Sequence, residues 1–227
     1  MSSWKETAQK YQYPIFVIYY TLYMLSFGLV EKLQPDSLYI IHCPIDQYIP
    51  FLEYFVVPYL GWFLYIGGIV FWLFLFDREN MCRLLWCGMI GMTIFVVISV
   101  FLPNGLDLRP EVFPRDNVFT RLTAFVYRID TSTNVFPSIH VNNSICACTA
   151  LVTSKKLRDN KGIQIFATVF AMLIILSTMF LKQHSVVDVT AGMLTGMVSC
   201  EVFFGDHLRE FRDRINCFLF EIKKALY

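Results

Sequence analysis

Charged residues are scarce in this sequence. Asp, Glu, Lys and Arg make up 16% of its 227 residues, whereas a soluble domain carries about 25%. So few charges cannot solubilise a chain that is 56% hydrophobic and contains 22 Phe and 12 Tyr residues. A strong net charge is also missing, and the value of +1 excludes a highly basic nucleic-acid-binding protein and a dominant acidic tail. The composition therefore indicates a membrane protein.

Cysteine pairs of the C-x-x-C type are absent, although the chain has seven Cys residues. Five of them fall inside apolar stretches, where cysteine behaves as a small hydrophobic residue. A secreted disulfide scaffold is therefore not expected. The spacing around the His residues matches no zinc signature, so we expect no metal and no cofactor. The five cysteines in apolar stretches are Cys82, Cys87, Cys146, Cys148 and Cys200.

Charged residues are missing altogether from five long windows, and a sixth apolar window is interrupted only by Asp188 and Glu201. A helix needs about 20 apolar residues to cross the hydrocarbon core of a bilayer. We therefore predict an all-α integral membrane bundle of six transmembrane helices, forming a single domain over residues 1–227. The first window lacks a small-residue cleavage site and is expected to be a retained helix. The predicted spans lie near residues 13–31, 53–76, 84–103, 138–154, 162–181 and 184–204.

Lys and Arg are distributed unevenly between the two sides of such a bundle. Of the 19 residues, 13 lie on the side of the termini and six on the opposite side. Because cytoplasmic loops carry the excess, we predict cytoplasmic termini in a multi-pass protein of the cell membrane. In the tail, residues 206–227, apolar residues recur every three to four positions. This pattern fits an amphipathic helix on the inner membrane surface, or a solvated helix packed on the span ends.

Only four histidines occur, and two of them fall at the outer ends of predicted spans. Ionisable groups at such positions are rare and mark functional sites. His184 and Asp188 are four residues apart, so they share one helical face. The carboxylate can accept from one imidazole nitrogen and leave the other nitrogen as a nucleophile or base. The other two, His42 and His207, lie in a loop and in the tail, and we do not expect them in the site.

His140 lies at the outer end of the fourth predicted span, shortly after Pro137 and Ser138. Proline suits a helix start, serine can cap it, and the amides that open a helix bind anions. The preceding outer segment contains Arg109, whose guanidinium can hold a phosphate bidentately. With His184 on the same side of the membrane, the pattern indicates phosphoryl transfer: one histidine attacks phosphorus, and the other protonates the leaving oxygen.

Three segments resemble the motifs of a known family. The sequence FPSIHVNNS, residues Phe136–Ser144, looks like a Pro-Ser-x-His motif, and STMFLKQHSVVDV, residues Ser177–Val189, looks like a Ser-x6-His-x3-Asp motif. Together with Arg109-Pro110 they resemble the type 2 phosphatidic acid phosphatase superfamily of integral-membrane lipid phosphatases. The sequence around His184 is especially similar to that of the branch of inositol phosphorylceramide and sphingomyelin synthases. The resemblance covers roughly residues 105–205, which we take as the catalytic core.

The resemblance also implies residue roles. His184 would be the nucleophile, Asp188 its orienting partner and His140 the acid for the leaving group. Arg109, Ser138 and Ser177 would bind the phosphate. Lys182 is either an interfacial anchor or a further phosphate contact.

The sequence departs from the family pattern at three positions. Leu102 stands where the first motif has Lys, Ile139 where the second has Gly, and Thr178 where the third has Arg. Two cations of the usual phosphate site are therefore absent. Lys182, Arg115 and Arg121 are the candidates to replace them.

The predicted function is that of a metal-independent membrane lipid phosphatase acting through a phosphohistidine. The substrate would resemble phosphatidic acid, phosphatidylglycerophosphate or a polyprenyl diphosphate, with the site on the extracytoplasmic side. Transfer of the head group to a hydroxyl acceptor, as in the synthase branch, is the first alternative. An apolar segment between residues 104 and 133 would favour transfer if it shields the site as an interfacial helix, or it packs as an ordinary loop helix. A proton-coupled transporter using the same ionisable residues is the second alternative.

Overall fold

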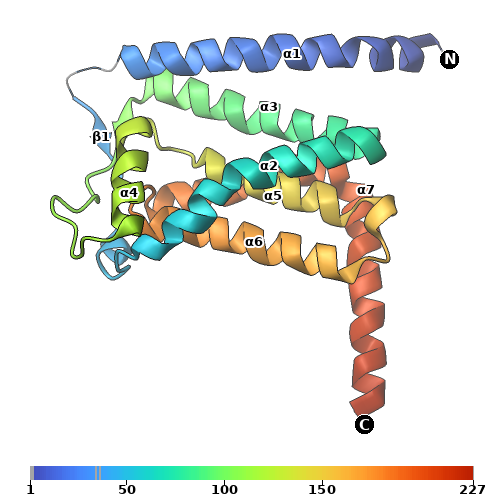
Figure 1. Ribbon diagram of the computed structural model, residues 1–227. Coiled ribbons are helices and arrows are strands. Elements are labelled where there is room, and N and C mark those ends of the chain that lie inside the picture. Colours follow the sequence, from blue (N-terminus) through green and yellow to red (C-terminus); the bar gives the residue numbers. More distant parts are fainter. Residues whose placement is uncertain (1–2, 34, 36, 227) are drawn as a thin grey trace.

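The computed structural model describes the backbone of residues 3–33, 35 and 37–226, and the side chains of residues 13–33, 35, 37–206 and 209. Its main feature is a set of long helices that run side by side and alternate in direction (Figure 1). Both ends of the described chain lie at the same end of this bundle. The helices of the bundle are α1 (Ser3–Lys32), α2 (Val56–Phe76), α3 (Arg78–Phe101), the shorter α5 (Ile139–Val152), α6 (Lys161–Phe180) and α7 (Val186–Leu226). The predicted all-α membrane class is confirmed.

Five of these helices are long and apolar enough to span a membrane. The exception among the predicted spans is α5, which has 14 residues. At 1.5 Å per residue it is about 21 Å long, shorter than the hydrocarbon core of about 30 Å. Helix α5 lies within the predicted span 138–154, with Ser138 as its N-cap and Thr153 as its C-cap.

The short helix α5 lies at the centre of the bundle, where it packs against α2, α3, α6 and α7. Its contact with α7 is close because α7 presents glycine there. A Cβ atom added to Gly192 would lie 2.5 Å from the carbonyl oxygen of Ser138, and one added to Gly196 would lie 3.2 Å from that of Asn142. The two glycines thus set how near the start of α5 lies to α7.

The inner end of the bundle, where both chain ends lie, is held by polar contacts around one residue. Asp77 ends α2 and also caps α3, since its carboxylate accepts from the amide of Asn80 at 3.3 Å. The same carboxylate accepts from the hydroxyl of Ser154 at 2.6 Å, just before the short 3-10 helix η3 (Lys155–Leu157). Asn80 in turn donates to the carbonyl of Ala150 at 3.0 Å. Three helices are joined here without a long loop.

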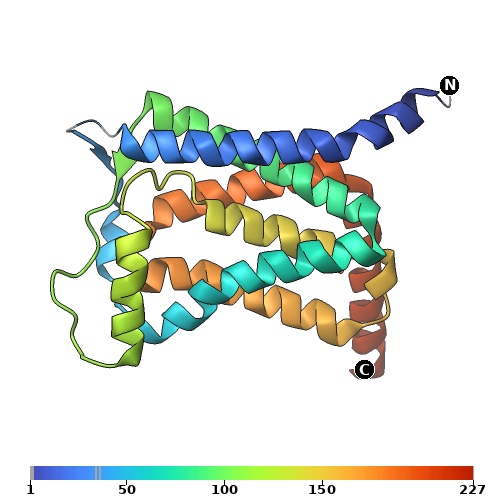
Figure 2. The same ribbon diagram turned by 45° about the horizontal axis from the view of Figure 1, so that its top comes forward.

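The opposite, outer end carries the longer connections. A helix that runs across the bundle, α4 (Val118–Ile129), covers part of this end (Figures 1 and 2). Strand β1 (Tyr39–Ile40) pairs in parallel with β2 (Asn104–Gly105), and this pairing joins the connection between α1 and α2 to the connection between α3 and α5. Two short 3-10 helices, η1 (Pro44–Gln47) and η2 (Glu53–Phe55), lead into α2.

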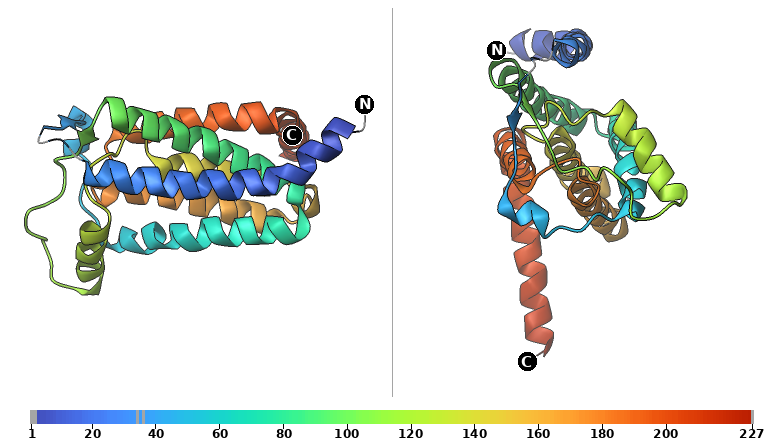
Figure 3. Two further views of the ribbon diagram at one scale, coloured as in Figure 1. Left: turned by 90° about the horizontal axis from the view of Figure 1, so that it is seen from above. Right: turned by 90° about the vertical axis from the view of Figure 1, so that its left-hand side faces the viewer.

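Helix α1 lies at the edge of the bundle and packs along α3 (Figure 3). Only 6% of its apolar window is buried, so most of its surface would face lipid in a membrane. The predicted amphipathic tail, residues 206–227, can be described only in part, because the side chains of residues 207–208 and 210–227 lie outside the described set. Its backbone continues α7 as one helix and turns across the direction of the bundle (Figure 1).

Candidate active site

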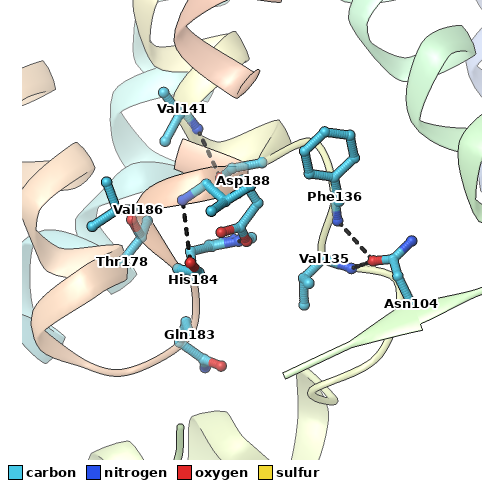
Figure 4. Close-up of polar contacts among 12 residues, drawn as sticks. Asn104, Val135, Phe136, Val141, Thr178, Gln183, His184, Val186 and Asp188 are labelled. Atoms are coloured by element: carbon cyan, nitrogen blue, oxygen red, sulfur yellow. Dashed lines mark hydrogen bonds and ion pairs between the residues drawn. The ribbon is translucent and has the colours of Figure 1, made fainter. Parts of the chain in front are cut away.

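The histidine–aspartate pair predicted from its spacing is formed at the outer end of α7. His184 lies just before the helix, and Nδ1 of its ring is 2.5 Å from Oδ2 of Asp188. Both side chains are nearly closed to solvent, with exposed fractions of 8% and 0%. Figure 4 shows the two side chains together. Because Nδ1 is engaged by the carboxylate, Nε2 is the ring nitrogen left to react.

His140 faces this pair from the first turn of α5. Its ring centroid is 5.7 Å from that of His184, at 63° between the ring planes. Two aromatic rings from α2 hold it in place: Tyr59 at 4.9 Å and Trp62 at 4.6 Å between centroids. The two histidines and Asp188 are therefore brought together from two helices, with α2 forming the wall behind His140.

Ser138 sets the start of α5 and its distance from α7. Its hydroxyl accepts from the amide of Val141, and its own amide donates to the backbone carbonyl of Asp188 at 3.1 Å. The preceding loop is fixed by Asn104, whose side-chain oxygen accepts from the amides of Val135 and Phe136 (Figure 4). Ser138 is thus a capping residue in this structure.

Arg109 is held by several contacts, one of them to Gln183, the residue that precedes His184. Its guanidinium donates to the carbonyls of Tyr127 at 3.1 Å and Asp130 at 2.6 Å, and to the side-chain oxygen of Gln183. It also stacks on the ring of Tyr127, 4.4 Å from the centroid. Burial lowers the pKa of Arg109, and the carboxylate of Asp130 opposes that shift, but a guanidinium stays charged at neutral pH. The predicted cation is therefore present at the site.

Two buried donors of this group have no partner among the described residues. They are Nε of Arg109 and Nε2 of Gln183. Oδ1 of Asp188 is a buried acceptor that also has no partner among the described residues. Buried polar groups are nearly always paired, so the two donors mark a place where an anion or water would bind. Gln183 precedes His184 directly, and in Figure 4 its side chain extends away from the His184 ring.

Two predicted substrate-binding residues are turned to other partners. Nζ of Lys182 donates to the carbonyls of Asp46 at 2.7 Å and Ile49 at 2.5 Å in the first outer segment, and burial lowers the pKa of this amine. The hydroxyl of Ser177 donates to Ile174 within α6 at 2.6 Å. In this structure Lys182 therefore anchors a loop, and Ser177 is paired inside its own helix.

The other candidate cations are paired as well. Arg115 forms an ion pair with the buried Glu53, with 2.8 Å between Nε and Oε1. Arg121 pairs with Asp116 on the exposed side of α4, with 3.0 Å between Nε and Oδ1. Neither forms a hydrogen bond or ion pair with the histidines in the described part of the chain.

Three residues at this end were not expected from the sequence. Tyr59 donates its hydroxyl to the carboxylate of Asp130, which ends α4. Asp46 accepts from the amide of Val186 at 2.9 Å and from the hydroxyl of Ser185 at 2.6 Å, so it caps α7 from a distant loop. These three residues are Tyr59, Asp130 and Asp46. Tyr59 lies inside the predicted span 53–76 and the two aspartates lie in the outer segments, and no motif or spacing marks any of them.

The fold and the site together define a helical membrane protein with a buried histidine–carboxylate pair facing a second histidine. The family model of the PAP2 superfamily matches residues 84–212, more than half of the chain, and the chain belongs to this superfamily. Members of the superfamily are phosphatases, which makes an enzyme the expected class.

Among solved structures, the crystal structure of LpxE from Aquifex aeolicus is similar. The alignment covers 78% of this chain and 95% of that chain, at 19% sequence identity and a TM-score of 0.42. No curated protein sequence matches the chain.

Proposed function

We propose that the protein is a membrane lipid phosphatase that cleaves a phosphate ester through a phosphohistidine at His184. The observation that carries the proposal is the convergence of two histidines, one carboxylate and two unpartnered buried donors at one end of the bundle. A phosphate group would pair with the free donors of Arg109 and Gln183 and with the first-turn amides of α5.

The first step uses His184 as the nucleophile. Its Nε2 attacks phosphorus, the bond to the lipid oxygen breaks, and His140 gives a proton to that oxygen. Asp188 accepts the hydrogen bond of Nδ1 and stabilises the positive charge that develops on the ring. In the second step water attacks the phosphohistidine, His140 takes the proton, and the P–N bond breaks. Both steps balance without a metal ion.

Tyr59 and Asp130 would support His140 in this role. The Tyr59 ring lies against His140, and its hydroxyl donates to the Asp130 carboxylate. Tyr59 thereby holds the imidazole ring that would give its proton to the leaving group. The pair is thus a positioning group for the acid, outside the predicted site.

The substrate is expected to reach the site from the membrane, with its phosphate at the outer end of the bundle. Candidates are phosphatidic acid, phosphatidylglycerophosphate and a polyprenyl diphosphate. The distribution of Lys and Arg supports an extracytoplasmic position for this end. Transfer to a hydroxyl acceptor remains the alternative because α4 runs across this end and would limit the access of water.

The test uses full-length protein purified in detergent and the three lipid phosphates, each with and without an added alcohol. We expect phosphate release that chelators leave unchanged, and a ³²P label on the protein that is lost in acid and stable in base. His184→Ala should abolish both, whereas His42→Ala, an exposed loop residue, should leave both unchanged. Release of phosphate without any label on His184 would contradict the covalent step. Transfer to the alcohol in place of release would favour the synthase alternative.

The transporter alternative is tested with the same preparation. Wild-type protein in proteoliposomes should show no proton-coupled flux. A flux that depends on His140 and His184, together with no phosphate release, would overturn the enzyme proposal.

A further inference from the structure

Three cysteines from three different helices meet in the core of the bundle. They are Cys87 on α3, Cys146 on α5 and Cys200 on α7, and their sulfur atoms all lie within 4.8 Å of one another. The three residues are 0%, 0% and 3% exposed. A fourth cysteine, Cys148, is only two residues from Cys146, yet its sulfur lies 3.7 Å from the hydroxyl of Thr168 on α6. The face of α5 on which a cysteine lies therefore decides whether it belongs to the cluster.

The cluster is separate from the candidate active site. On α5, Cys146 lies six residues after His140, which is about 9 Å along the helix. The sulfur of Cys87 lies 3.3 Å from the carbonyl of Ser199, and that of Cys146 lies 4.0 Å from the carbonyl of Gly196. These contacts are to the backbone of α7, so the thiols have no role in the phosphatase chemistry proposed above.

We propose that Cys87, Cys146 and Cys200 form a binding site for a soft monovalent metal ion, Cu(I). Thiolate ligands select soft ions, and Zn(II) prefers four ligands in a tetrahedron. The cluster offers three sulfur atoms, and neither histidine nor carboxylate belongs to it in the described part of the chain. Three sulfur atoms around one ion at about 2.3 Å would lie about 4.0 Å apart. The observed limit of 4.8 Å requires a closure of less than 1 Å.

Binding of Cu(I) can be written with a full balance of protons and charge. Each thiolate that binds replaces an S–H bond and releases one proton. Cu(I) held by two thiolates and one neutral thiol releases two protons and leaves a net charge of minus one, with no electron transferred. A larger net charge would be costly in a bundle core surrounded by apolar side chains.

The experiment measures Cu(I) binding under anaerobic conditions. Full-length protein in detergent carries Cys43→Ser, Cys82→Ala, Cys148→Ala and Cys217→Ser, so that only the cluster remains. Cu(I) is supplied in competition with a bathocuproine chelator, and Zn(II) is titrated in parallel. We expect one bound Cu(I) per chain, X-ray absorption showing three sulfur ligands at about 2.3 Å, and no comparable Zn(II) binding.

The matched variants are made in the otherwise wild-type chain. The variants Cys146→Ala and Cys200→Ala, each made separately, should lose the bound Cu(I) ion, whereas Cys148→Ala should keep it. No Cu(I) retained against the chelator, retention in Cys146→Ala, or tighter binding of Zn(II) would each overturn the proposal. If an Ala variant fails to purify as a monodisperse protein, the stoichiometry and sulfur count of the three-cysteine protein decide the question.

Discussion

The outer end of the bundle and the edge helix α1 are built in different ways. At the outer end, buried polar side chains from separate segments bond one another, as Arg109 bonds to Gln183 and Tyr59 to Asp130. Along its length, helix α1 packs on α3 through aromatic contacts such as that of Phe16 with Trp86. It adds two tyrosine hydrogen bonds, from Tyr20 to the carbonyl of Leu85 at 3.0 Å and from Tyr19 to that of Met89 at 2.8 Å. Precise placement of polar groups is therefore concentrated where chemistry is proposed, and a change there should cost far more activity than one along α1.

The largest effect is expected from Asp188→Asn. The amide keeps the size of the carboxylate but cannot stabilise a charged His184 ring, so kcat should fall about 10²- to 10⁴-fold. Phosphate release from the preferred lipid measures it. Asp159→Asn, an exposed residue before α6, is the matched control and should retain full activity. Equal activity of the two variants would remove the orienting role from Asp188.

The next effect is expected from Gly192→Ala. The added Cβ would lie 2.5 Å from the carbonyl of Ser138, so α5 and α7 must move apart. A displacement of about 1 Å between reacting groups can cost about 10²-fold in rate. Gly67→Ala on α2 is the control, since no atom lies within 4 Å of a Cβ there. Comparing kcat of the two variants tests whether helix separation positions the histidines.

A smaller effect is expected from Tyr59→Phe and Asp130→Asn. Each removes a charge-assisted hydrogen bond of about 1.5 kcal/mol, or about tenfold in rate. Because the negative charge beside His140 is lost in Asp130→Asn, the alkaline limb of its rate–pH profile should move to lower pH. Tyr54→Phe, half-exposed on η2, serves as the control. A uniform loss of rate without any movement of the profile would show a structural role only.

The smallest effect is expected on α1, from Tyr20→Phe. The lost hydrogen bond to Leu85 should lower stability by about 0.6 kcal/mol, as is usual between membrane helices. Activity should stay within twofold of the wild type. Thermal unfolding in detergent and phosphate release measure the two quantities. A loss of activity as large as that of Tyr59→Phe would mean that α1 is coupled to the site, and the contrast between the two regions would fail.

The sequence predicted the class of the fold and most of its helices because charge-free windows report burial in lipid directly. It placed α5 within a span, residues 138–154, that also includes both caps of the helix, since apolar composition does not show where a helix ends. It did not predict the pairing of β1 with β2, because strands of two residues leave no periodicity to detect.

For the site, the spacing of His184 and Asp188 was enough to predict their contact, since a helix brings residues four apart together. His140 followed from its place at the start of a span on the same side. Gln183, Tyr59 and Asp46 could not be predicted, because their contacts join segments that only the tertiary structure brings together. The sequence allows two roles for Lys182, an interfacial anchor or a phosphate contact. In the structure its amine donates to two loop carbonyls.

The single-residue connection at Asp77 has a consequence for motion. Because a single residue connects α2 to α3, these two helix ends cannot move far apart. The hydrogen bond from Ser154 to Asp77 holds the end of α5 at the same point. Relative movement of these helices is therefore smallest at the inner end and grows with distance from it. Widening of the bundle to admit a lipid would occur at the outer end, where the connecting segments are long. The inner end would act as the fixed pivot of that movement.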